Sequence, residues 1–588
     1  MKKILLFTII SIPSVWGGLI HPSDGSELSY IYIMFRWGVN NSVDSYEFEL
    51  SSSEDFTSIL INDIVIDTTY FVKEYIDWGE TYFWRTKVVG DIWGDANRFS
   101  IGPKISNVTV TMYDEDNYSE GYTIFGSADG YYSAIIDKNG NEIWNSSDKN
   151  IIYSNFDNNG SFFGSQYFAD RENDYPGIKF SINNNILWME PNEEYLHHEF
   201  MQLPWGDYMG LVHESRDGPI HIDNMSMQII YFYQNIFGKV CDGTTDEWPW
   251  LGDKLVIWDK NTKEVKWSWS TFNYYNMIDY DENKWNVMPE LGVPFEWTHV
   301  NAFFYDERDG SIYISVRNLS RITKIQIQYD DINDIITGGD IIWNMGHEYP
   351  SGNVHFGHSL GFSQQHSISL TDADNILILD NGNYSVDYYG ASEETTRALE
   401  IAISESSNSY SATIVKEFPL LPASVLFGSQ SGNVQQVDNG NYLITTIGDN
   451  GTSREVSPEG NIIWEAKYNS SLLWRANRIP STLFINTQLE NILSLNNKII
   501  PNEYNINKIY PNPFNPTINI DYEIIKFSFI SAKILNLKGQ LIDIVDLGYK
   551  KPGNYSITWD GYLQPSGMYL FVLDNQTSKL TQKIMFVK

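Results

Sequence analysis

The sequence contains a single cysteine, Cys241, among 588 residues. A disulfide within the chain is therefore excluded, so the fold must be stabilised by core packing and strand pairing. One thiol is compatible with the cytoplasm and with export. We expect Cys241 to be an ordinary buried or loop residue without a catalytic role.

Long apolar runs and basic residues are also scarce. No segment beyond the N-terminus has 18 uncharged apolar residues in a row, so we expect no membrane span. Lys and Arg number 39 against 75 Asp and Glu, which gives a formal net charge of −36. A field of that sign repels nucleic acid and anionic lipid. The charge excludes nucleic-acid partners, and any anion site must be built from local cationic groups.

The N-terminus has the pattern of a secretory signal peptide. Lys2 and Lys3 precede a largely apolar run at residues 4–12, then Pro13 and small residues up to Gly18. A charged head with an apolar stretch of this length is typical of a cleaved export signal, and it is too short to cross a membrane. We expect residues 1–17 to be removed during export.

The rest of the chain indicates an all-β protein of two or three domains. Hydrophobic residues make up 42% and aromatic residues 15% of the sequence. Short alternating runs are separated by Asn-Gly, Asp-Gly and Asn-Asn pairs, which favour tight turns between antiparallel strands. No long amphipathic helix is predicted.

Residues 18–104 form a first unit. Alternating aromatic and polar residues at 31–37, 46–50 and 82–89 have the spacing of a small sandwich. The unit resembles a fibronectin type III or immunoglobulin-like module. Such modules are usually spacers or dimer contacts, so a homodimer is left open and no chemistry is assigned here.

Residues 105–485 carry an internal repeat. A turn rich in Asn or Gly, an apolar strand and a tryptophan recur at Trp144, Trp188, Trp267, Trp343 and Trp464. Repetition of small antiparallel units at tens of residues is typical of a β-propeller. At roughly 40 to 60 residues a repeat, six blades are predicted. Residues 215–255 and 270–297 are interpreted as loop insertions, and the repeat itself says nothing of function.

Residues 505–588 form a third unit after a linker at 486–504. The unit opens with Ile-Tyr-Pro-Asn-Pro-Phe-Asn-Pro at residues 509–516. Motif and tail resemble the C-terminal sorting domain of the type IX secretion system. The resemblance implies a β-sandwich that is recognised by that secretion machinery, and a secreted or cell-surface location.

Nine of the ten histidines fall between residues 197 and 366. Blades of a propeller converge on a central channel, so distant histidines can meet there. The crowding alone is compatible with a metal site or with general acid/base chemistry. His355 and His358 have a metal-like spacing, but no cysteine cluster or His-Glu-x-x-His helix accompanies them, and we expect neither a metal nor a cofactor. The nine are His197, His198, His213, His221, His299, His347, His355, His358 and His366.

The order of local motifs across residues 108–482 resembles the bacterial arylsulfotransferase family, which does not use the nucleotide sulfate donor. The motifs are His-His-Glu at 197–199, Trp-Thr-His-Val-Asn at 297–301, Ser-Val-Arg-Asn at 315–318, Gln-His at 365–366 and Arg-Ala-Leu-Glu at 397–400. The resemblance implies a six-bladed propeller that transfers a sulfuryl group from an aryl sulfate donor to a phenolic acceptor. It implies a ping-pong reaction through a sulfohistidine.

The resemblance also assigns roles to residues. His366 would be the nucleophile, and His299, Arg317 and His198 would bind and stabilise the sulfuryl group. Asn301, Arg397 and His197 are further candidates for substrate binding. These roles agree with chemistry, because neutral imidazole attacks electrophilic sulfur and a guanidinium fork holds sulfuryl oxygens.

Two other readings of the propeller remain. It could have lost its chemistry and bind glycan or protein at the cell surface, or it could be a quinone-dependent dehydrogenase. The dehydrogenase type needs eight blades and a vicinal cysteine pair or calcium carboxylates, which a chain with only Cys241 does not favour. Arylsulfotransferases of enteric bacteria carry a disulfide that this chain cannot form, so it belongs to another branch.

Overall fold

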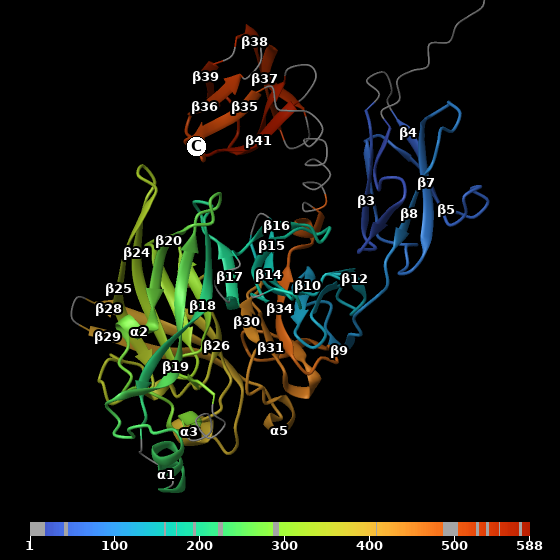
Figure 1. Ribbon diagram of the computed structural model, residues 1–588. Helices are drawn as coiled ribbons and strands as arrows, with labels where there is room; N and C mark the ends of the chain where they lie inside the picture. The colour runs from blue at the N-terminus through green and yellow to red at the C-terminus, as the bar shows by residue number, and fades with distance from the viewer. Residues whose placement is uncertain are drawn as a thin grey trace, which may run out of the picture. The chain divides into compact units, whose positions relative to one another are not determined.

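The structure is a computed structural model of the 588-residue chain (Figure 1). The expected signal peptide lies outside the described residues, as does most of the expected linker. The described residues are 18–39, 45–157, 160–171, 173–191, 196–221, 227–285, 293–406, 409–485, 488, 504–524, 528–536, 540–551, 553–574 and 579–588.

The chain is all-β, as predicted, and divides into two compact units at residues 491 and 492. The second unit has two sheets, ordered β35-β36-β39 and β38-β37-β40-β41. Their shared core contains Phe514, Trp559 and Phe586. The strands are β35 Tyr504–Tyr510, β36 Thr517–Ile524, β37 Ser528–Asn536, β38 Leu541–Lys550, β39 Gly553–Asp560, β40 Gly567–Asp574 and β41 Lys579–Phe586.

Residues 19–101 of the first unit fold into two sheets, ordered β1-β3-β6 and β2-β8-β7-β4-β5. Alternate residues of β3 and β7 face inward, so Phe35, Trp37 and Trp84 are buried. The strands are β1 Leu19–His21, β2 Ser26–Leu28, β3 Ile33–Trp37, β4 Tyr46–Ser51, β5 Ile59–Val65, β6 Thr69–Val72, β7 Thr81–Val88 and β8 Asn97–Ile101.

Residues 109–479 fold into six antiparallel sheets that follow one another along the chain (Figure 1). Their orders are β12-β11-β10-β34, β13-β14-β15-β16, β17-β18-β19-β20, β22-β23-β24-β25, β26-β27-β28-β29 and β30-β31-β32-β33-β9. Neighbouring sheets contact through β13, β17, β22, β26, β30 and β34, and β34 returns to β13. These six strands therefore form a closed cycle of contacts.

The bounds of the first sheets are β9 Thr109–Tyr113, β10 Tyr122–Ser127, β11 Tyr132–Ile136, β12 Glu142–Asn145, β13 Ile151–Phe156, β14 Phe162–Gln166, β15 Gly177–Phe180, β16 Ile186–Met189, β17 Leu196–Gln202, β18 Tyr208–Pro219, β19 Asp246–Trp258, β20 Val265–Ser270 and β21 Phe295–Glu296. Those of the later sheets are β22 Val300–Asp306, β23 Ser311–Val316, β24 Arg321–Asp330, β25 Ile335–Gly346, β26 His366–Leu370, β27 Ile376–Asp380, β28 Arg397–Ser406, β29 Ser409–Pro419, β30 Asn433–Gln436, β31 Tyr442–Thr446, β32 Thr452–Val456, β33 Ile462–Lys467 and β34 Leu473–Ile479.

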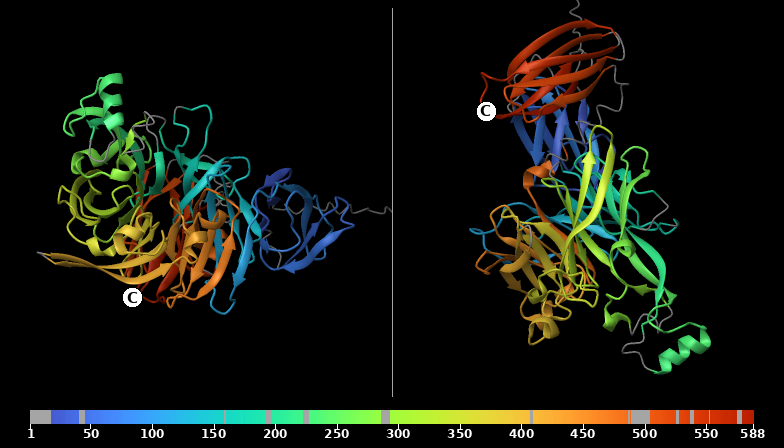
Figure 2. Two further views of the ribbon diagram at one scale, coloured as in Figure 1. Left: turned by 90° about the horizontal axis from the view of Figure 1, so that it is seen from below. Right: turned by 90° about the vertical axis from the view of Figure 1, so that its left-hand side faces the viewer.

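The two ends of this region are joined to each other. Strand β34, from the end, pairs with β10, and β9, from the start, pairs with β33. The view from below in Figure 2 shows these early (blue) and late (orange) strands side by side. Closure by both ends removes two open sheet edges.

The repeated tryptophans lie on the fourth strands and link neighbouring sheets. The indole N–H groups donate to oxygens of the next sheet: Trp144 to Ile182, Trp188 to Lys260, Trp267 to Gly338, Trp343 to the Glu405 carboxylate and Trp464 to Lys138. In the one sheet without such a tryptophan, Lys416 donates to the Pro458 carbonyl. The sequence repeat therefore marks the contacts between sheets.

The predicted loop insertions contain regular structure. Residues 215–255 extend β18 and β19 into a long hairpin, and helix α1 (Met227–Ile236) lies beyond it (Figures 1 and 2). Residues 270–297 contain the short helices α2 (Thr271–Tyr274) and α3 (Glu282–Trp285) and strand β21. Helices α4 (Ser385–Tyr389) and α5 (Ala423–Leu426) are equally short, and the 3-10 turns are η2 (His358–Leu360) and η3 (Gly448–Asn450). Repeat patterns did not predict these elements because insertions interrupt the repeat.

Candidate active site

Three of the predicted histidines occupy equivalent places on three neighbouring sheets. His198 lies in β17, His299 directly precedes β22, and His366 is the first residue of β26. Strand register shifts at each of these places, and φ is 66° at His198 and 50° at His299. A bulge re-aims a side chain, and strained backbone gathers at functional sites. The local irregularity thus turns the imidazoles toward one place.

The three imidazoles meet at short range. Nε2 of His198 lies 2.8 Å from Nε2 of His299, and the ring centroids of His198 and His366 are 6.4 Å apart. Trp474, on the closing strand β34, stacks on His198 with centroids 4.9 Å apart. Four sheets therefore contribute one ring each to this cluster.

The hydrogen bonds of His366 fix its tautomer. Its Nδ1 lies 2.8 Å from Oδ1 of Asn381, whose amide nitrogen donates to the carbonyls of Gly428 and Ser431. Oδ1 must therefore accept, so Nδ1 carries the proton. The lone pair on Nε2 faces the backbone N–H of Ser431 at 3.2 Å.

Burial keeps His366 neutral. Burial first, and then the charges of Arg317 and His299, lower its pKa well below the usual 6.5. The hydrogen bond to Asn381 opposes this shift without overcoming it. The imidazole consequently presents an unprotonated nitrogen at neutral pH.

A carboxylate and a lysine support His299. Nδ1 of His299 lies 2.6 Å from Oε1 of Glu296, and Nζ of Lys284 lies 3.3 Å from Oε2 of the same carboxylate. Burial raises the pKa of Glu296, but the hydrogen bond from His299 and the charges of His299 and Lys284 bring it well below its usual range. Burial and the charge of Arg317 lower the pKa of Lys284 to about 8.

Arg317 is buried in the turn between β23 and β24. Its backbone N–H donates to the carbonyl of His299, and its terminal nitrogens donate to Asn318 Oδ1 and to the Ser429 carbonyl. Its Nε is buried and has no hydrogen-bond partner among the described residues. A buried unsatisfied N–H is costly, and here it is a donor left over for an anionic ligand.

The remaining predicted residues have other surroundings. The guanidinium of Arg397 donates to Asp380, Glu417 and the Leu360 carbonyl, so its contacts are those of a structural residue. The side chain of His197 lies outside the described part of the chain.

Asn301 is fully buried and acts through its neighbours. Its amide donates to the Gln365 carbonyl, directly before His366, at 2.7 Å. Its backbone carbonyl accepts from Arg475, which pairs with the buried carboxylate of Glu199 at 2.5 Å. This network ties the strands of all three histidines to β34.

Sequence reasoning missed Glu296, Lys284, Asn381, Glu199 and the pair Trp474–Arg475. Glu296 directly precedes the motif at 297–301, and Glu199 directly follows His198, so adjacency was an available signal. The residues on β34 gave no such signal, because they reach the histidines only through the pairing of β34 with β10.

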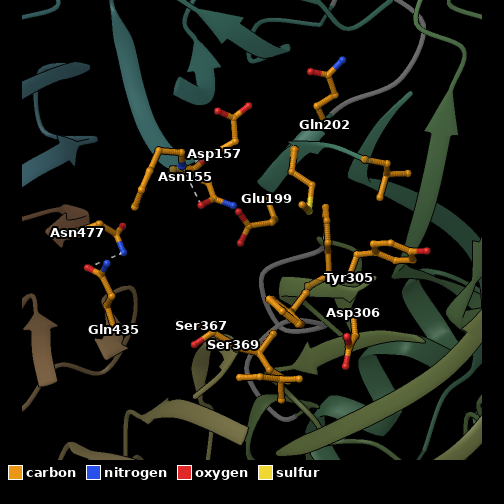
Figure 3. A pocket seen from close by; sticks show the side chains of 18 of the residues that line it. Asn155, Asp157, Glu199, Gln202, Tyr305, Asp306, Ser367, Ser369, Gln435 and Asn477 are labelled. Atoms are coloured by element: carbon orange, nitrogen blue, oxygen red, sulfur yellow. Dashed lines mark hydrogen bonds between the residues drawn. The ribbon is translucent and has the colours of Figure 1, made fainter. Parts of the chain in front are cut away.

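A cavity of about 1010 Å³ is lined by residues of the same strands (Figure 3). Amide and carboxyl groups such as Asn155, Gln202, Asp306, Gln435 and Asn477 line it, and the Glu199–Arg475 pair is part of its wall. Because Glu199 and Arg475 directly follow His198 and Trp474, this wall is one residue away from the histidine cluster. No group of three or more His, Cys, Asp or Glu in the described ranges is arranged to hold a metal.

A match to a family model shows the family to which the chain belongs. The arylsulfotransferase (ASST) family model matches residues 108–472, which is more than half of the chain. The chain belongs to the arylsulfotransferase family. The secretion system C-terminal sorting domain model matches residues 508–588, which indicates export and a secreted or cell-surface location. No helix of the described residues is long and apolar enough to span a membrane.

No match was found among curated proteins. Solved structures that resemble this chain include a Bacteroides caccae protein of unknown function, at 11% identity and a TM-score of 0.34, covering 61% of this chain and 98% of that one. PorZ of Porphyromonas gingivalis, a type IX secretion component, is 9% identical with a TM-score of 0.26, covering 96% and 69%. At these TM-scores the likenesses carry no argument about this chain.

Proposed function

We propose that this arylsulfotransferase moves a sulfuryl group from a phenolic sulfate ester to a phenol through a covalent sulfohistidine on His366. We further propose that residues 105–485 are a six-bladed propeller, that residues 18–104 are a fibronectin type III-like module, and that residues 1–17 and 486–504 are a signal peptide and a linker. The closed cycle of strand contacts supports the propeller.

The first half-reaction uses the unprotonated nitrogen of His366. The Nε2 lone pair forms an N–S bond as the S–O bond to the aryl group breaks, and the electron pair leaves on the phenolate oxygen. The paired imidazoles of His198 and His299 supply the proton to that oxygen. Asn381 accepts from Nδ1 and stabilises the positive charge on the substituted ring.

The second half-reaction reverses these steps. The acceptor phenol attacks sulfur, the N–S bond breaks and its electron pair returns to Nε2, and the phenolic proton passes to the His198–His299 pair. The unused Nε–H of Arg317 donates to a sulfuryl oxygen, and the Ser431 N–H, which is released from Nε2 when the N–S bond forms, donates to another. The arrangement supplies the local cationic groups that a chain of net charge −36 needs to hold an anion.

One observation carries the proposal: a neutral imidazole with an unprotonated Nε2 lies in one cluster with two histidines and an arginine that has an unused buried donor. The test is incubation of the purified protein with 4-nitrophenyl sulfate and a phenol, following nitrophenol release. Release should require the acceptor and be lost in His366→Ala. Mass spectrometry of donor-treated protein should find a sulfuryl adduct on the peptide of His366.

Other outcomes have definite meanings. Release into water without an acceptor would indicate a sulfatase. An absence of release with every aryl sulfate would contradict the proposal and favour a binding role at the cell surface. Full activity of His366→Ala would exclude it as the nucleophile.

A further inference from the structure

A second cavity, of about 640 Å³, lies beside the segment that leads into His366. Asp281 lines this cavity, and its Oδ2 accepts from Nε2 of Gln364, two residues before His366, at 2.9 Å. The charge of Asp281 also acts on the pKa of Lys284 and of Arg317. Asp281 therefore lies between the cavity and the residues of the proposed sulfuryl site.

Aromatic rings form much of the cavity. Tyr280 stacks on His221 with centroids 4.2 Å apart, and Tyr388 stacks on His347 at 4.2 Å with parallel planes. Tyr349 packs edge-on against His347 at 5.1 Å. Each stacked pair holds its rings in place, so the cavity has preformed flat apolar walls that suit an aromatic guest.

The charge of the lining has one sign. Four carboxylates line the cavity, from Asp242, Asp281, Glu282 and Glu348, and the described lining residues include no lysine or arginine. The cations of the site, Arg317 and Lys284, are not among the lining residues. A bound molecule therefore experiences positive charge at the histidine cluster and negative charge in the aromatic cavity.

We infer that this cavity holds the aromatic ring of the substrate and selects phenols whose far substituent is cationic. The inference rests on the proposed function, and it specifies the substrate class. A cationic substituent gains attraction from the carboxylates and contact with ring faces. An anionic substituent is repelled by the same carboxylates, and a neutral one is intermediate.

The test uses three phenols with similar para substituents and different charge. With 4-nitrophenyl sulfate as donor, kcat/KM is measured for 4-(2-aminoethyl)phenol, 4-(2-hydroxyethyl)phenol and 3-(4-hydroxyphenyl)propanoate. We expect the amine to exceed the carboxylate at least tenfold at low salt, with a smaller ratio at 0.5 M salt because exposed charges are screened. Equal values for the three acceptors would overturn the inference and leave sulfuryl transfer standing.

Two variants locate the effect. Glu348→Gln removes an exposed charge from the cavity, and we expect it to reduce the amine-to-carboxylate ratio several-fold. Glu459→Gln makes the same change in the exposed turn between β32 and β33 and should leave the ratio as in the wild type. Equal effects of the two variants would assign the preference to net charge and contradict the cavity.

Binding provides a measurement that needs no turnover. The three phenols are titrated calorimetrically into His366→Ala, in which no sulfuryl transfer can hide a binding step. Tighter binding of the amine, weakened by adding Glu348→Gln, supports the inference even if no aryl sulfate is turned over. Equal binding of amine and carboxylate overturns it.

Discussion

The carboxamide oxygen of Asn381 lies 2.8 Å from Nδ1 of His366 and fixes which nitrogen of that ring is unprotonated. The partners of Asn381 are backbone carbonyls, so its amide cannot flip without losing two hydrogen bonds. A neutral side chain at this place accepts the hydrogen bond from Nδ1 without stabilising a positive charge on the ring as a carboxylate would. Asn381 is therefore suited to keep the His366 imidazole neutral and oriented.

Asn381→Asp should move the acid limb of the reaction. A carboxylate beside Nδ1 raises the pKa of His366, by about 1 to 3 units for an opposite charge at this range. The ring then gains a proton at a higher pH than in the wild type, whose pKa lies well below 6.5, and the first half-reaction slows at correspondingly higher pH. Rapid mixing with 4-nitrophenyl sulfate at pH 5 to 8 measures this.

Asn381→Leu is the control for that shift. It removes the acceptor without adding charge, so the rate should fall at every pH and the acid limb should move to lower pH, opposite to the shift in Asn381→Asp. An acid limb that is unmoved in Asn381→Asp would contradict the assigned tautomer.

Lys284 should control the alkaline limb. Its cation is present below its pKa of about 8 and is lost as the pH rises through that value. We expect the rate of the first half-reaction to decline above pH 8 in the wild type and to stay level in Lys284→Arg, whose side chain remains charged. The donor half-reaction is the appropriate readout because the sulfate ester does not titrate in this range. The same decline in both proteins would exclude Lys284 as its cause.

Arg317→Lys should be costly although it retains the charge. Lysine cannot reproduce the fork that donates to Asn318 and Ser429 while leaving Nε free. Loss of such a preorganised donor costs roughly 10²- to 10³-fold in rate. We expect kcat and kcat/KM to fall by similar factors, as for an interaction made in the transition state. Arg308→Lys, at an exposed ion pair with Asp306, is the matched control and should change kcat less than twofold.

Glu199→Leu should destabilise the fold. The carboxylate is 3% exposed and pairs with Arg475, so its removal leaves a buried uncompensated charge, at a cost of about 3 to 5 kcal/mol. The double variant Glu199→Leu/Arg475→Met should recover part of that loss, since neither charge remains. Urea unfolding followed by tryptophan fluorescence measures both. A double variant less stable than the single one would contradict an ion-pair origin.

Trp464→Phe should lower the free energy of unfolding by about 1 kcal/mol beyond the loss of ring area, the value of one hydrogen bond. The indole N–H of Trp464 donates to the Lys138 carbonyl of the neighbouring sheet at 2.9 Å. Trp37→Phe is the control, because Trp37 is equally buried but its indole nitrogen has no hydrogen-bond partner among the described residues. Urea midpoints that fall equally in both variants would show that ring volume alone matters.

The repeated elements of the fold could be predicted from the sequence, whereas contacts that depend on the pairing of β34 with β10 could not. The strand-and-tryptophan pattern predicted an all-β chain, and the tryptophans do lie between sheets, because a repeated contact leaves a repeated residue. The motif residues His198, His299, Arg317 and His366 lie together, although their roles stay predictions. Lys284 comes from an insertion without any period, so no pattern marked it.

The site also shows why motif membership does not fix a residue's role. Asn301 and Arg397 belong to motifs that the family resemblance singled out, yet the amide of Asn301 holds the backbone beside His366, and Arg397 pairs with Asp380 and Glu417. Trp474, outside every motif, stacks on His198. Which residue contacts substrate depends on burial and partners, which a linear pattern does not contain.

Because β34 pairs with β10, the surroundings of the histidines are complete only when the chain has been synthesised beyond β34. The last strand delivers Trp474 and Arg475, so a nascent or proteolytically shortened polypeptide ending before residue 473 has three histidines but lacks the ring and the cation that complete their surroundings. We therefore expect the proposed activity only after β34 has been synthesised. The sorting domain that indicates export follows later in the chain, at residues 508–588.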